Sequence, residues 1–363
     1  MAQYRSFRDL DWALIIISIA ICGIGVLQIF SATHDTPTWS DAWWKQIVYI
    51  CAGIVLLWAV SKIDYHTLLG QAPLLYVLTI LALLGTFAVG KMVFGSRRWI
   101  GIGGFHLQVS EFAKLVIVLL VARYLSGVKG EQLEVRDLVR LGGLVGLPLL
   151  LVLAQPDLGT SLTYLPILAV GVFLAGVRWK YVLTIAVGIG LMLPVGWHFL
   201  KDYQKARLVS FLDPSQDPKG SGYQVIQSKI AVGQGGMWGR GVTRGTQTQL
   251  RFLPVPHTDF IFSAFAEEHG FVGIVVVLGL YFLLLMQIVQ NAQTSPDRAG
   301  MYICMGVAAL LLFHLLVNVG MVVGRMPVTG IPLPLMSAGG SNILSMFLML
   351  GLVNNVRLRR FVN

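Results

Sequence analysis

The chain has 363 residues, of which 56% are hydrophobic and 12% are charged, and its formal net charge at pH 7 is +10. Soluble domains carry about 25% charged residues, so this composition excludes a soluble globular fold and favours a membrane protein built of helices or a closed barrel. The positive charge is spread over the loops between apolar runs, which suits anionic lipid headgroups or an anionic substrate and argues against nucleic acid as a partner.

Ten apolar runs follow one another along the chain, and most approach the roughly 20 residues that a helix needs to cross a bilayer. They are too long for the strands of a barrel. We therefore expect an all-α polytopic membrane protein, a single integral membrane domain over residues 1–363. The expected spans are residues 12–32, 44–60, 72–94, 107–125, 138–154, 160–177, 179–199, 259–290, 300–323 and 342–356.

The lysines and arginines of the short loops predict the orientation, because such residues gather on the cytoplasmic side of a membrane. With the N-terminus inside, that side holds Arg5, Arg8, Lys62, Arg123, Lys129, Arg136, Arg140, Arg178, Lys180, Arg298, Arg357, Arg359 and Arg360. The short loops of the other side hold only Lys45, Lys91, Arg97, Arg98 and Arg325. Both termini are therefore expected on the cytoplasmic side.

One long connection, residues 200–258, then falls on the extracytoplasmic side between the seventh and eighth spans. It carries the cations Lys201, Lys205, Arg207, Lys219, Lys229, Arg240, Arg244 and Arg251 against three aspartates. That excess suggests an anionic ligand, and a solvated loop that meets lipid headgroups is an equally good interpretation. The apolar positions Tyr223, Ile226 and Ile230 predict a short interfacial helix. In the glycine-rich stretch 233–241, backbone N–H groups could approach a phosphate closely.

Ionisable residues inside apolar spans are costly and therefore mark candidate functional sites. In the fourth span Glu111 and Lys114 are three residues apart, close enough to pair on a helix face that points into the bundle. An ion pair that only fixes helix packing is nearly as good an interpretation as a direct role with the substrate. In the turn 154–160, we expect Asp157 to cap the next helix.

An acid also lies at the border of the eighth span, in the sequence Pro-Val-Pro-His-Thr-Asp of residues 254–259. Thr258 is expected to cap the helix and Asp259 to lie in its first turn, where the helix dipole favours the ionised carboxylate. A first-turn acid without function is the alternative, but the apolar surroundings and the neighbouring basic loop favour a functional carboxylate. Glu267 and Glu268 lie roughly 12 Å further along the helix, too far to share a proton with Asp259.

The segment 325–341 ahead of the last span contains three prolines and repeated glycines. Irregular backbone at membrane depth is tolerated where it lines a cavity, so this segment is expected to form a re-entrant loop. His198 and His314 lie in apolar runs and are interpreted as packed residues. The extracytoplasmic face thus combines a basic loop, glycine-rich backbone, one acid and a proline-rich insert, which fits a lipid-linked phosphate substrate that enters sideways from the bilayer.

Several motifs, in this order along nearly the whole chain, resemble those of the SEDS family of shape, elongation, division and sporulation proteins. They are Phe94-Gly-Ser-Arg-Arg-Trp-Ile-Gly101, Gln108-Val-Ser-Glu-Phe-Ala-Lys114, Gln155-Pro-Asp-Leu-Gly-Thr-Ser161, Tyr223-Gln-Val-Ile-Gln-Ser228, Gly233-Gln-Gly-Gly-Met-Trp-Gly-Arg-Gly241, Leu253-Pro-Val-Pro-His-Thr-Asp-Phe-Ile-Phe262 and Gly330-Ile-Pro-Leu-Pro-Leu-Met-Ser-Ala-Gly-Gly-Ser341. Short tails and the motif 155–161 favour the elongation branch of the family over the division branch. Two departures are Ala338 and Val109, where the family commonly has an aromatic residue and a proline.

The resemblance implies a bacterial inner-membrane peptidoglycan glycosyltransferase of ten helices that polymerises lipid II during cell-wall elongation. The implied partners are lipid II, a class B penicillin-binding protein that acts as transpeptidase, and the elongation proteins MreC, MreD and the MreB filament. Asp259 matches the family's essential extracytoplasmic aspartate, and Trp99 matches a functionally sensitive tryptophan. Glu111 and Lys114 match its paired cavity charges. The other expected cavity or substrate-binding residues are Arg97, Arg98, Ser110, Arg240, Arg244, His257, Thr258, Ser337, Gly339, Gly340 and Ser341.

On this hypothesis, Asp259 is the general base for an acceptor sugar hydroxyl, and arginine and lysine side chains stabilise the departing pyrophosphate. Arg97, Arg98, Lys114, Arg240 and Arg244 are the candidate cations. No cofactor follows from the sequence; a divalent cation, Mg²⁺ or Mn²⁺, stays open, with unknown ligands. Two alternatives are a lipid II flippase gated by the Glu111–Lys114 pair and a scaffold that activates the penicillin-binding protein.

Overall fold

The computed structural model describes residues 9–93, 96–102, 105–128, 130, 132–199, 202–214, 217 and 220–360. The helices are α1 (Trp12–Thr33), α2 (Ala42–Lys62), α3 (Tyr65–Val89), α4 (Val109–Ser126), α5 (Val135–Ala154), α6 (Leu158–Leu162), α7 (Tyr164–Leu174), α8 (Trp179–Phe199), α9 (Asp202–Leu212), α10 (Ser221–Gly235), α11 (Thr246–Gln249), α12 (Ile261–Gln293), α13 (Arg298–Val322) and α14 (Gly340–Leu358). The strands are β1 (Lys91–Val93), β2 (Ser96–Ile102) and β3 (Phe105–Gln108). Helices dominate, which confirms the expected fold class.

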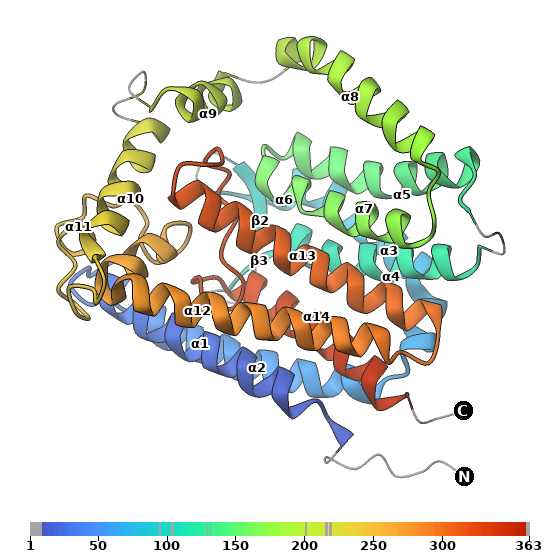
Figure 1. Ribbon diagram of the computed structural model, residues 1–363, viewed down its shortest axis with the longest axis horizontal. Coiled ribbons are helices and arrows are strands. Elements are labelled where there is room, and N and C mark those ends of the chain that lie inside the picture. Colours follow the sequence, from blue (N-terminus) through green and yellow to red (C-terminus); the bar gives the residue numbers. More distant parts are fainter. Residues whose placement is uncertain are drawn as a thin grey trace.

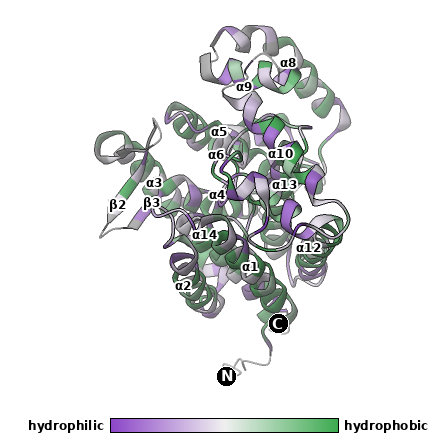
Figure 2. Ribbon diagram, turned by 90° about the vertical axis from the view of Figure 1, so that its left-hand side faces the viewer, coloured by the Kyte–Doolittle hydropathy of each residue, from purple (hydrophilic) through white to green (hydrophobic). Residues whose placement is uncertain are grey.

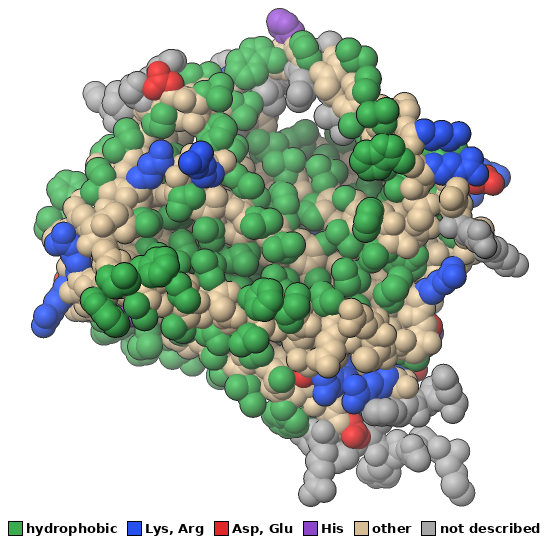
Figure 3. Space-filling model, viewed as in Figure 1, with side chains coloured by type: hydrophobic (Ala, Val, Ile, Leu, Met, Phe, Trp, Pro, Cys, Tyr) green, Lys and Arg blue, Asp and Glu red, His purple; other side chains and the backbone are tan. Residues whose placement is uncertain are grey.

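The long helices run side by side as a bundle (Figure 1), in which α4, α13 and α14 are the most buried. Helix α13 packs against α12, α4 and α7, and α14 packs along α2. The core between them is apolar, with Val307, Leu310 and Phe347 fully buried. Large apolar side chains also cover much of the outer surface (Figure 3). An apolar exterior around helices that satisfy their own backbone hydrogen bonds is the arrangement that a lipid environment requires.

Six described helices are long and apolar enough to cross a membrane, namely α1, α2, α3, α5, α12 and α13. The pair α6–α7 and helix α8 are shorter apolar helices, and α4 and α14 carry more polar residues. Each of the ten expected spans coincides with one of these helices or with the α6–α7 pair. The chain is thus a multi-pass membrane protein, and ten crossings stay a prediction.

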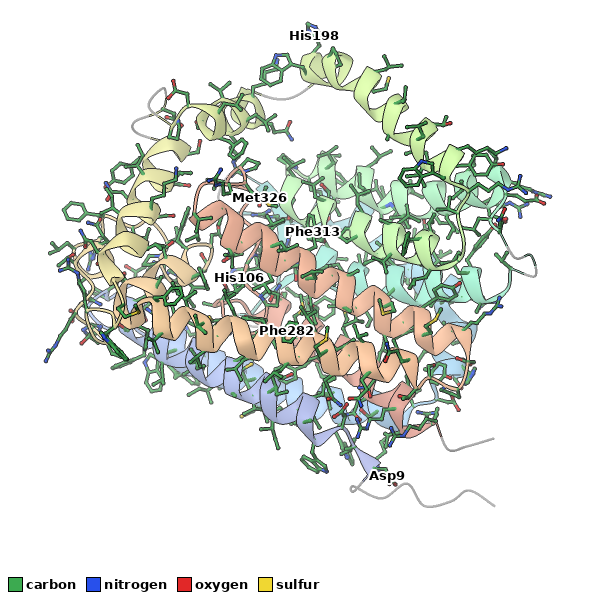
Figure 4. The ribbon with its side chains drawn as sticks, viewed as in Figure 1. Asp9, His106, His198, Phe282, Phe313 and Met326 are labelled. Carbon is green, nitrogen blue, oxygen red and sulfur yellow. The ribbon has the colours of Figure 1, made fainter. Side chains whose placement is uncertain are left out.

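Helices α8 and α9 stand apart from the bundle in two views at right angles (Figures 1 and 2). Helix α8 packs closely on no other described helix, and Leu191 and Met192 are 72% and 63% exposed. His198 lies at the outer end of α8, away from the bundle (Figure 4). The expectation that His198 is a packed residue is wrong, because the helix that carries it contributes little to the core.

A small antiparallel sheet of order β1-β2-β3 joins α3 to α4 and was not expected in an all-α fold. The third span was expected to reach residue 94, but α3 ends at Val89 because Gly90 takes an extended conformation, with φ −62° and ψ 133°. The β2–β3 register pairs Trp99 with Gln108. The sheet therefore carries the basic motif of residues 96–101 back to the start of α4.

The glycine-rich stretch 233–241 packs on the backbone of α12. A Cβ on Gly239 would lie 2.1 Å from the carbonyl oxygen of Glu268, so only glycine allows this approach. The N–H groups of Arg240 and Gly241 donate to the carbonyls of Glu267 and Glu268, each at 3.0 Å. The expectation that this backbone approaches a phosphate is therefore not supported, because α12 already occupies these N–H groups.

The side chains of Glu267 and Glu268 on α12 make further hydrogen bonds near the place where residues 233–241 pack on this helix. The Glu267 carboxylate accepts hydrogen bonds from Gln247 N at 2.8 Å and Thr248 Oγ1 at 2.9 Å. The Glu268 carboxylate accepts from the side chains of Gln28 and Ser31 on α1. Glu267 thus holds the loop against α12, and Glu268 joins α12 to α1, which agrees with the expectation that neither shares a proton with Asp259.

A second polar cluster joins three helices at the end of the bundle that carries both chain termini. The Asp11 carboxylate is 1% exposed and accepts from Gln287 Nε2 at 2.8 Å and Asn291 Nδ2 at 2.6 Å. It also pairs with the Arg357 guanidinium at 2.9 Å, and its N–H donates to Asn354. The cluster ties the start of α1 to α12 and α14.

Candidate active site

A cavity of about 580 Å³ opens between β2, α4, α6 and the segment that precedes α14. We call residues 325–341 the Pro/Gly segment. The cavity is lined by Arg98, Trp99, Gln108, Glu111, Pro156, Asp157, Leu158, Thr160, Arg207, Val255, Thr258, Asp259, Thr329, Gly330, Pro332, Ala338, Gly339, Ser341 and Asn342. Five separate parts of the sequence thus meet around one space, with cationic, anionic and polar side chains in its wall.

One wall of the cavity is an ion pair between β2 and the α5–α6 turn. The Arg98 guanidinium lies 2.7 Å from Asp157 Oδ2, and Gln108 Nε2 donates to the same oxygen at 2.9 Å. The other carboxylate oxygen accepts from Thr160 N at 3.1 Å, so Asp157 caps α6 as predicted. The cap and the ion pair together fix the position of Arg98, and with it that of Trp99 on the same strand.

The floor of the cavity contains the expected pair on α4. Lys114 is fully buried, and its Nζ lies 2.8 Å from Glu111 Oε2. The same oxygen accepts from Asn342 Nδ2 at 3.0 Å, while His314 Nε2 lies 3.5 Å from Lys114 Nζ. Glu111 and Asn342 line the cavity and Lys114 lies behind them, so the lysine acts on the cavity through the carboxylate.

Asp259 lies in a turn that the Pro/Gly segment and α13 hold in place. The carbonyls of residues 257, 258 and 259 accept hydrogen bonds in succession from Ala338 N at 2.9 Å, Ser337 Oγ at 2.8 Å and Asn318 Nδ2 at 2.9 Å. Helix α12 begins only at Ile261, after Phe260, which has no side-chain cap. The predictions that Thr258 caps the helix and that Asp259 lies in its first turn are wrong, because these three bonds keep the turn out of the helix.

Glycine at position 330 leaves room for the Asp259 carboxylate. Gly330 has φ +73°, and a Cβ there would lie 3.4 Å from Asp259 Oδ2. Among the residues that the structure describes, none donates a hydrogen bond to this carboxylate. With respect to the described residues, both oxygens of Asp259 are therefore available to a group that enters the cavity.

The charge state of Asp259 depends on two opposing effects. Burial raises the pKa of its carboxyl above the ordinary value, whereas the positive charges of Arg207 and Arg98 oppose the shift. The cations keep the ionised form accessible, and the burial strengthens it as a proton acceptor. A carboxylate in such surroundings is suited to general-base chemistry.

The structure brings together only part of the expected site. Among the expected residues, Asp259, Thr258, Glu111, Arg98, Trp99, Gly339 and Ser341 line the cavity. Ser110, Lys114, Ser337 and Gly340 lie directly behind that lining or next to it in the chain. The Arg97 side chain lies outside the described part of the structure.

Arg240, Arg244 and His257 do not line the cavity. Both arginines are exposed on the loop that packs on α12, and Arg240 Nε donates to the carbonyl of Gln234. The His257 ring points elsewhere, 4.8 Å from the ring of Trp39, and burial lowers its pKa to about 4. Because His257 is neutral at physiological pH, it adds no positive charge to the site.

Three residues of the site or its surroundings were not singled out from the sequence. Arg207 reaches the cavity from α9, and its only signal was membership of the basic loop. Asn342 follows the glycine pair of the last motif and has no charge to mark it. His314, interpreted as a packed residue, is indeed buried, but it has polar partners.

The carboxylates that line the cavity, and so could bind a divalent cation, are those of Glu111, Asp157 and Asp259. Glu111 and Asp157 are occupied by Lys114 and Arg98. Within the described ranges, no group of three or more His, Cys, Asp or Glu side chains is placed to hold one ion. The described residues therefore form no site in which protein side chains alone would hold Mg²⁺ or Mn²⁺, and no step of the reaction is assigned to either ion.

Comparisons with known proteins agree with the geometry. The family model described as the cell cycle protein FtsW/RodA/SpoVE matches residues 11–360. The chain is 38% identical to the peptidoglycan glycosyltransferase MrdB of Escherichia coli K12, over 98% of this chain and 96% of MrdB.

Two solved structures have the same fold. A chain from a structure described as "Structural coordination of polymerization and crosslinking by a peptidoglycan synthase complex" superposes with a TM-score of 0.85 at 35% identity, covering 98% of this chain and 99% of that one. The rod shape determining protein RodA of Thermus thermophilus superposes with a TM-score of 0.73 at 30% identity, with 98% of each chain covered.

Proposed function

The chain belongs to the SEDS family of FtsW, RodA and SpoVE proteins and is a peptidoglycan glycosyltransferase of cell-wall elongation, and we propose that Asp259 is its general base, with lipid II as the substrate. The observation that carries the proposal is the Asp259 carboxylate itself. It lines the cavity without a hydrogen-bond donor among the described residues and lies in the field of Arg98 and Arg207. A carboxylate that only stabilised the fold would have its donors within the protein.

The reaction that this cavity supports is a displacement at a sugar carbon. Asp259 accepts the proton of the acceptor sugar 4-hydroxyl, and the oxygen forms a bond to the anomeric carbon of the second lipid-linked disaccharide. The bond between that carbon and the phosphate oxygen breaks, and the electron pair leaves with the polyprenyl pyrophosphate. The proton stays on the carboxyl until solvent removes it, so atoms and charge balance.

The negative charge that develops on the pyrophosphate needs a cationic wall. Arg98 and Arg207 line the same cavity as Asp259, and Arg98 is held by Asp157 at 2.7 Å. Fixed cations of this kind stabilise a leaving group without reorganising during the reaction. Arg240, Arg244 and Lys114 are weaker candidates, since their side chains do not line the cavity. Arg97 stays a candidate from the sequence, because its side chain lies outside the described part of the structure.

The place of the reaction follows from the charge distribution. The excess of lysine and arginine in the short loops supports an orientation with both termini in the cytoplasm and the cavity on the outer face of the bacterial inner membrane. A related chain occurs in a peptidoglycan synthase complex that joins polymerisation to crosslinking. We accordingly expect a class B penicillin-binding protein as the partner of this chain, within an assembly that includes MreC, MreD and the MreB filament.

The proposal is tested by Asp259→Asn in the purified complex with its penicillin-binding partner, supplied with lipid II. Loss of a general base lowers the rate by about 10²–10⁴-fold, so glycan polymer should fall by that factor while the complex and its thermal unfolding stay intact. Asp35→Asn is the matched control, because Asp35 is an exposed aspartate in the α1–α2 loop. Polymerisation at the normal rate by Asp259→Asn would disprove the role of Asp259.

The same preparation separates the enzyme from a flippase. A flippase gated by Glu111 and Lys114 moves lipid II across a vesicle bilayer without forming a glycosidic bond. Translocation without polymer, abolished by Glu111→Gln and unaffected by Asp259→Asn, would favour transport. Polymer that depends on Asp259 favours the glycosyltransferase.

A further inference from the structure

Helix α13 carries two buried polar side chains on a face that is otherwise apolar. His314 and Asn318 are 1% and 0% exposed and are four residues apart, so they lie one above the other on one side of the helix. Their neighbours Leu310, Leu311 and Met321 belong to the apolar core. Figure 4 marks Phe313, the residue before His314, in the middle part of α13. We call His314 and Asn318 the α13 ridge.

His314 connects the Pro/Gly segment to the buried lysine of α4. Its Nδ1 lies 3.1 Å from the carbonyl oxygen of Pro332, which can only accept, so Nδ1 carries the ring proton. The neutral ring then presents the lone pair of Nε2 to Lys114 Nζ at 3.5 Å. The ammonium group of Lys114 therefore has an acceptor on α13 in addition to the Glu111 carboxylate.

Asn318 connects the same segment to the proposed base. Its Nδ2 donates two hydrogen bonds, one to the carbonyl of Asp259 and one to the carbonyl of Ile331, both at 2.9 Å. These two donors use the full capacity of the amide nitrogen. The turn that carries Asp259 and the segment that carries Gly330 are thus held to one another by a single side chain.

The ridge therefore contacts three of the parts that meet at the cavity, namely α4, the turn that carries Asp259 and the Pro/Gly segment. It contacts Lys114, which neutralises Glu111 on the cavity floor. It also binds two successive carbonyls of the Pro/Gly segment, those of Ile331 and Pro332, and the backbone carbonyl of Asp259. Polar side chains cost free energy when buried in an apolar helix unless each finds a partner. The partners found here all belong to the cavity or to its supports.

We infer that His314 and Asn318 are positioning residues for glycosyl transfer, which fix Asp259 relative to the Glu111–Lys114 pair through the Pro/Gly segment. The inference rests on the proposed role of Asp259. Neither side chain lines the cavity, so neither touches the substrate. They affect the rate by placing the groups that touch the substrate, because a reaction between bound partners is sensitive to their exact positions.

The first test separates the two hydrogen bonds of His314. In the complex with lipid II, His314→Leu removes both bonds and is expected to lower kcat about tenfold to a hundredfold, with KM changed less than about threefold. His314→Asn retains a donor at the position of Nδ1, and His314→Gln retains an acceptor near that of Nε2. Each should restore part of kcat, which a purely space-filling role would not allow.

The second test follows the pH profile of Asn318→Leu. The charged groups that face Asp259 are Arg98 on β2, Arg207 on α9 and Asp157 at the α5–α6 turn. Without Asn318 the turn loosens and water reaches the carboxylate, which reduces the burial that raises the pKa of Asp259. The acid limb of kcat/KM is therefore expected to move to lower pH, together with a loss of kcat of about tenfold.

Asn291→Leu is the matched control, since Asn291 is a buried asparagine with two polar partners at the far end of the bundle. It should lower the unfolding temperature and leave kcat, KM and the acid limb unchanged. The inference is overturned if His314→Leu and Asn318→Leu behave like this control while Asp259→Asn is inactive. If Asp259→Asn itself polymerises normally, the assignment of the base fails, and the ridge has no catalytic group to position.

Discussion

Two aspartates at opposite ends of the bundle show how the same side chain serves two purposes. The Asp11 carboxylate accepts from Gln287, Asn291 and the Arg357 guanidinium, and it also accepts from Leu14 N at the start of α1. Nothing in that arrangement is left for another molecule. Asp11 joins three helices and does so with every lone pair in use.

Asp259 has the opposite arrangement. Its backbone carbonyl is fixed by Asn318, but its carboxylate has no donor among the described residues and faces a cavity. Arg98 and Arg207 act on it through their charge. The comparison shows that a functional acid in this fold is recognised by a fixed backbone and a free side chain, because a structural acid has its side chain fixed as well.

The largest effect is expected when the two aspartates are changed to the same residue. Asp11→Ala leaves the Arg357 guanidinium without its carboxylate and should cost about 3–5 kcal/mol of stability, as for a broken buried ion pair. Asp259→Ala removes no side-chain hydrogen bond to a described residue and should change stability by less than about 1 kcal/mol, while polymerisation is lost. Thermal unfolding and activity per folded molecule measure both.

The assignment of Asp11 as structural and Asp259 as catalytic is wrong if each variant shows the result expected for the other. Folded Asp11→Ala without polymerase activity would mean that the terminal end of the bundle contributes to catalysis. A large stability loss in Asp259→Ala would mean that its carboxylate has a structural partner.

Gly330→Ala tests whether the free space around the Asp259 carboxylate is needed. An alanine at φ +73° is strained by about 1–2 kcal/mol, and its Cβ would lie 3.4 Å from Asp259 Oδ2. We expect a lower unfolding temperature together with a severalfold lower kcat. Gly143→Ala is the control, because Gly143 lies inside α5 with open space around it, and alanine there should be neutral or stabilising by about 0.5–1 kcal/mol. Equal activity of both variants would show that the space is not required.

Arg207→Gln tests the electrostatic part of the comparison. Burial raises the pKa of Asp259, and Arg207 lowers it. Without the arginine the pKa rises further, so the ionised base forms only at higher pH. The acid limb of kcat/KM should therefore move to higher pH, the opposite direction from Asn318→Leu. An unmoved limb would show that the charge of Arg207 does not reach the carboxylate.

Much of the fold follows from local pattern. The apolar runs coincide with helices because hydropathy over some twenty residues is a property of each segment alone. The Glu111–Lys114 pair follows from the spacing of one helix, and the Asp157 cap from its own turn. The motifs placed the chain in its family, which the comparisons confirm.

The errors concern contacts between distant segments. Thr258 was expected to cap α12, but its carbonyl is held by Ser337, 79 residues later in the chain. The backbone of residues 233–241 was expected to approach a phosphate, but Gly239 in this stretch lies close to the carbonyl of Glu268 on α12. No residue near Arg207 indicates that α9 places it at the cavity. Such placements depend on packing between segments, which a single sequence does not show.

The smallest effect is expected from the two arginines that the sequence suggested and the structure places outside the cavity. Arg240 and Arg244 are exposed on the loop that packs on α12, where solvent and salt screen their charge. Arg240→Gln and Arg244→Gln, singly or together, should change kcat/KM for lipid II less than about twofold at physiological salt. Arg98→Gln should cause a clear loss, because Asp157 holds the Arg98 guanidinium at the cavity wall. Initial rates with lipid II at two salt concentrations measure the difference. A loss in the loop variants as large as that of Arg98→Gln would show that the basic loop contacts the substrate. The loop would then have to move to the cavity when the substrate binds.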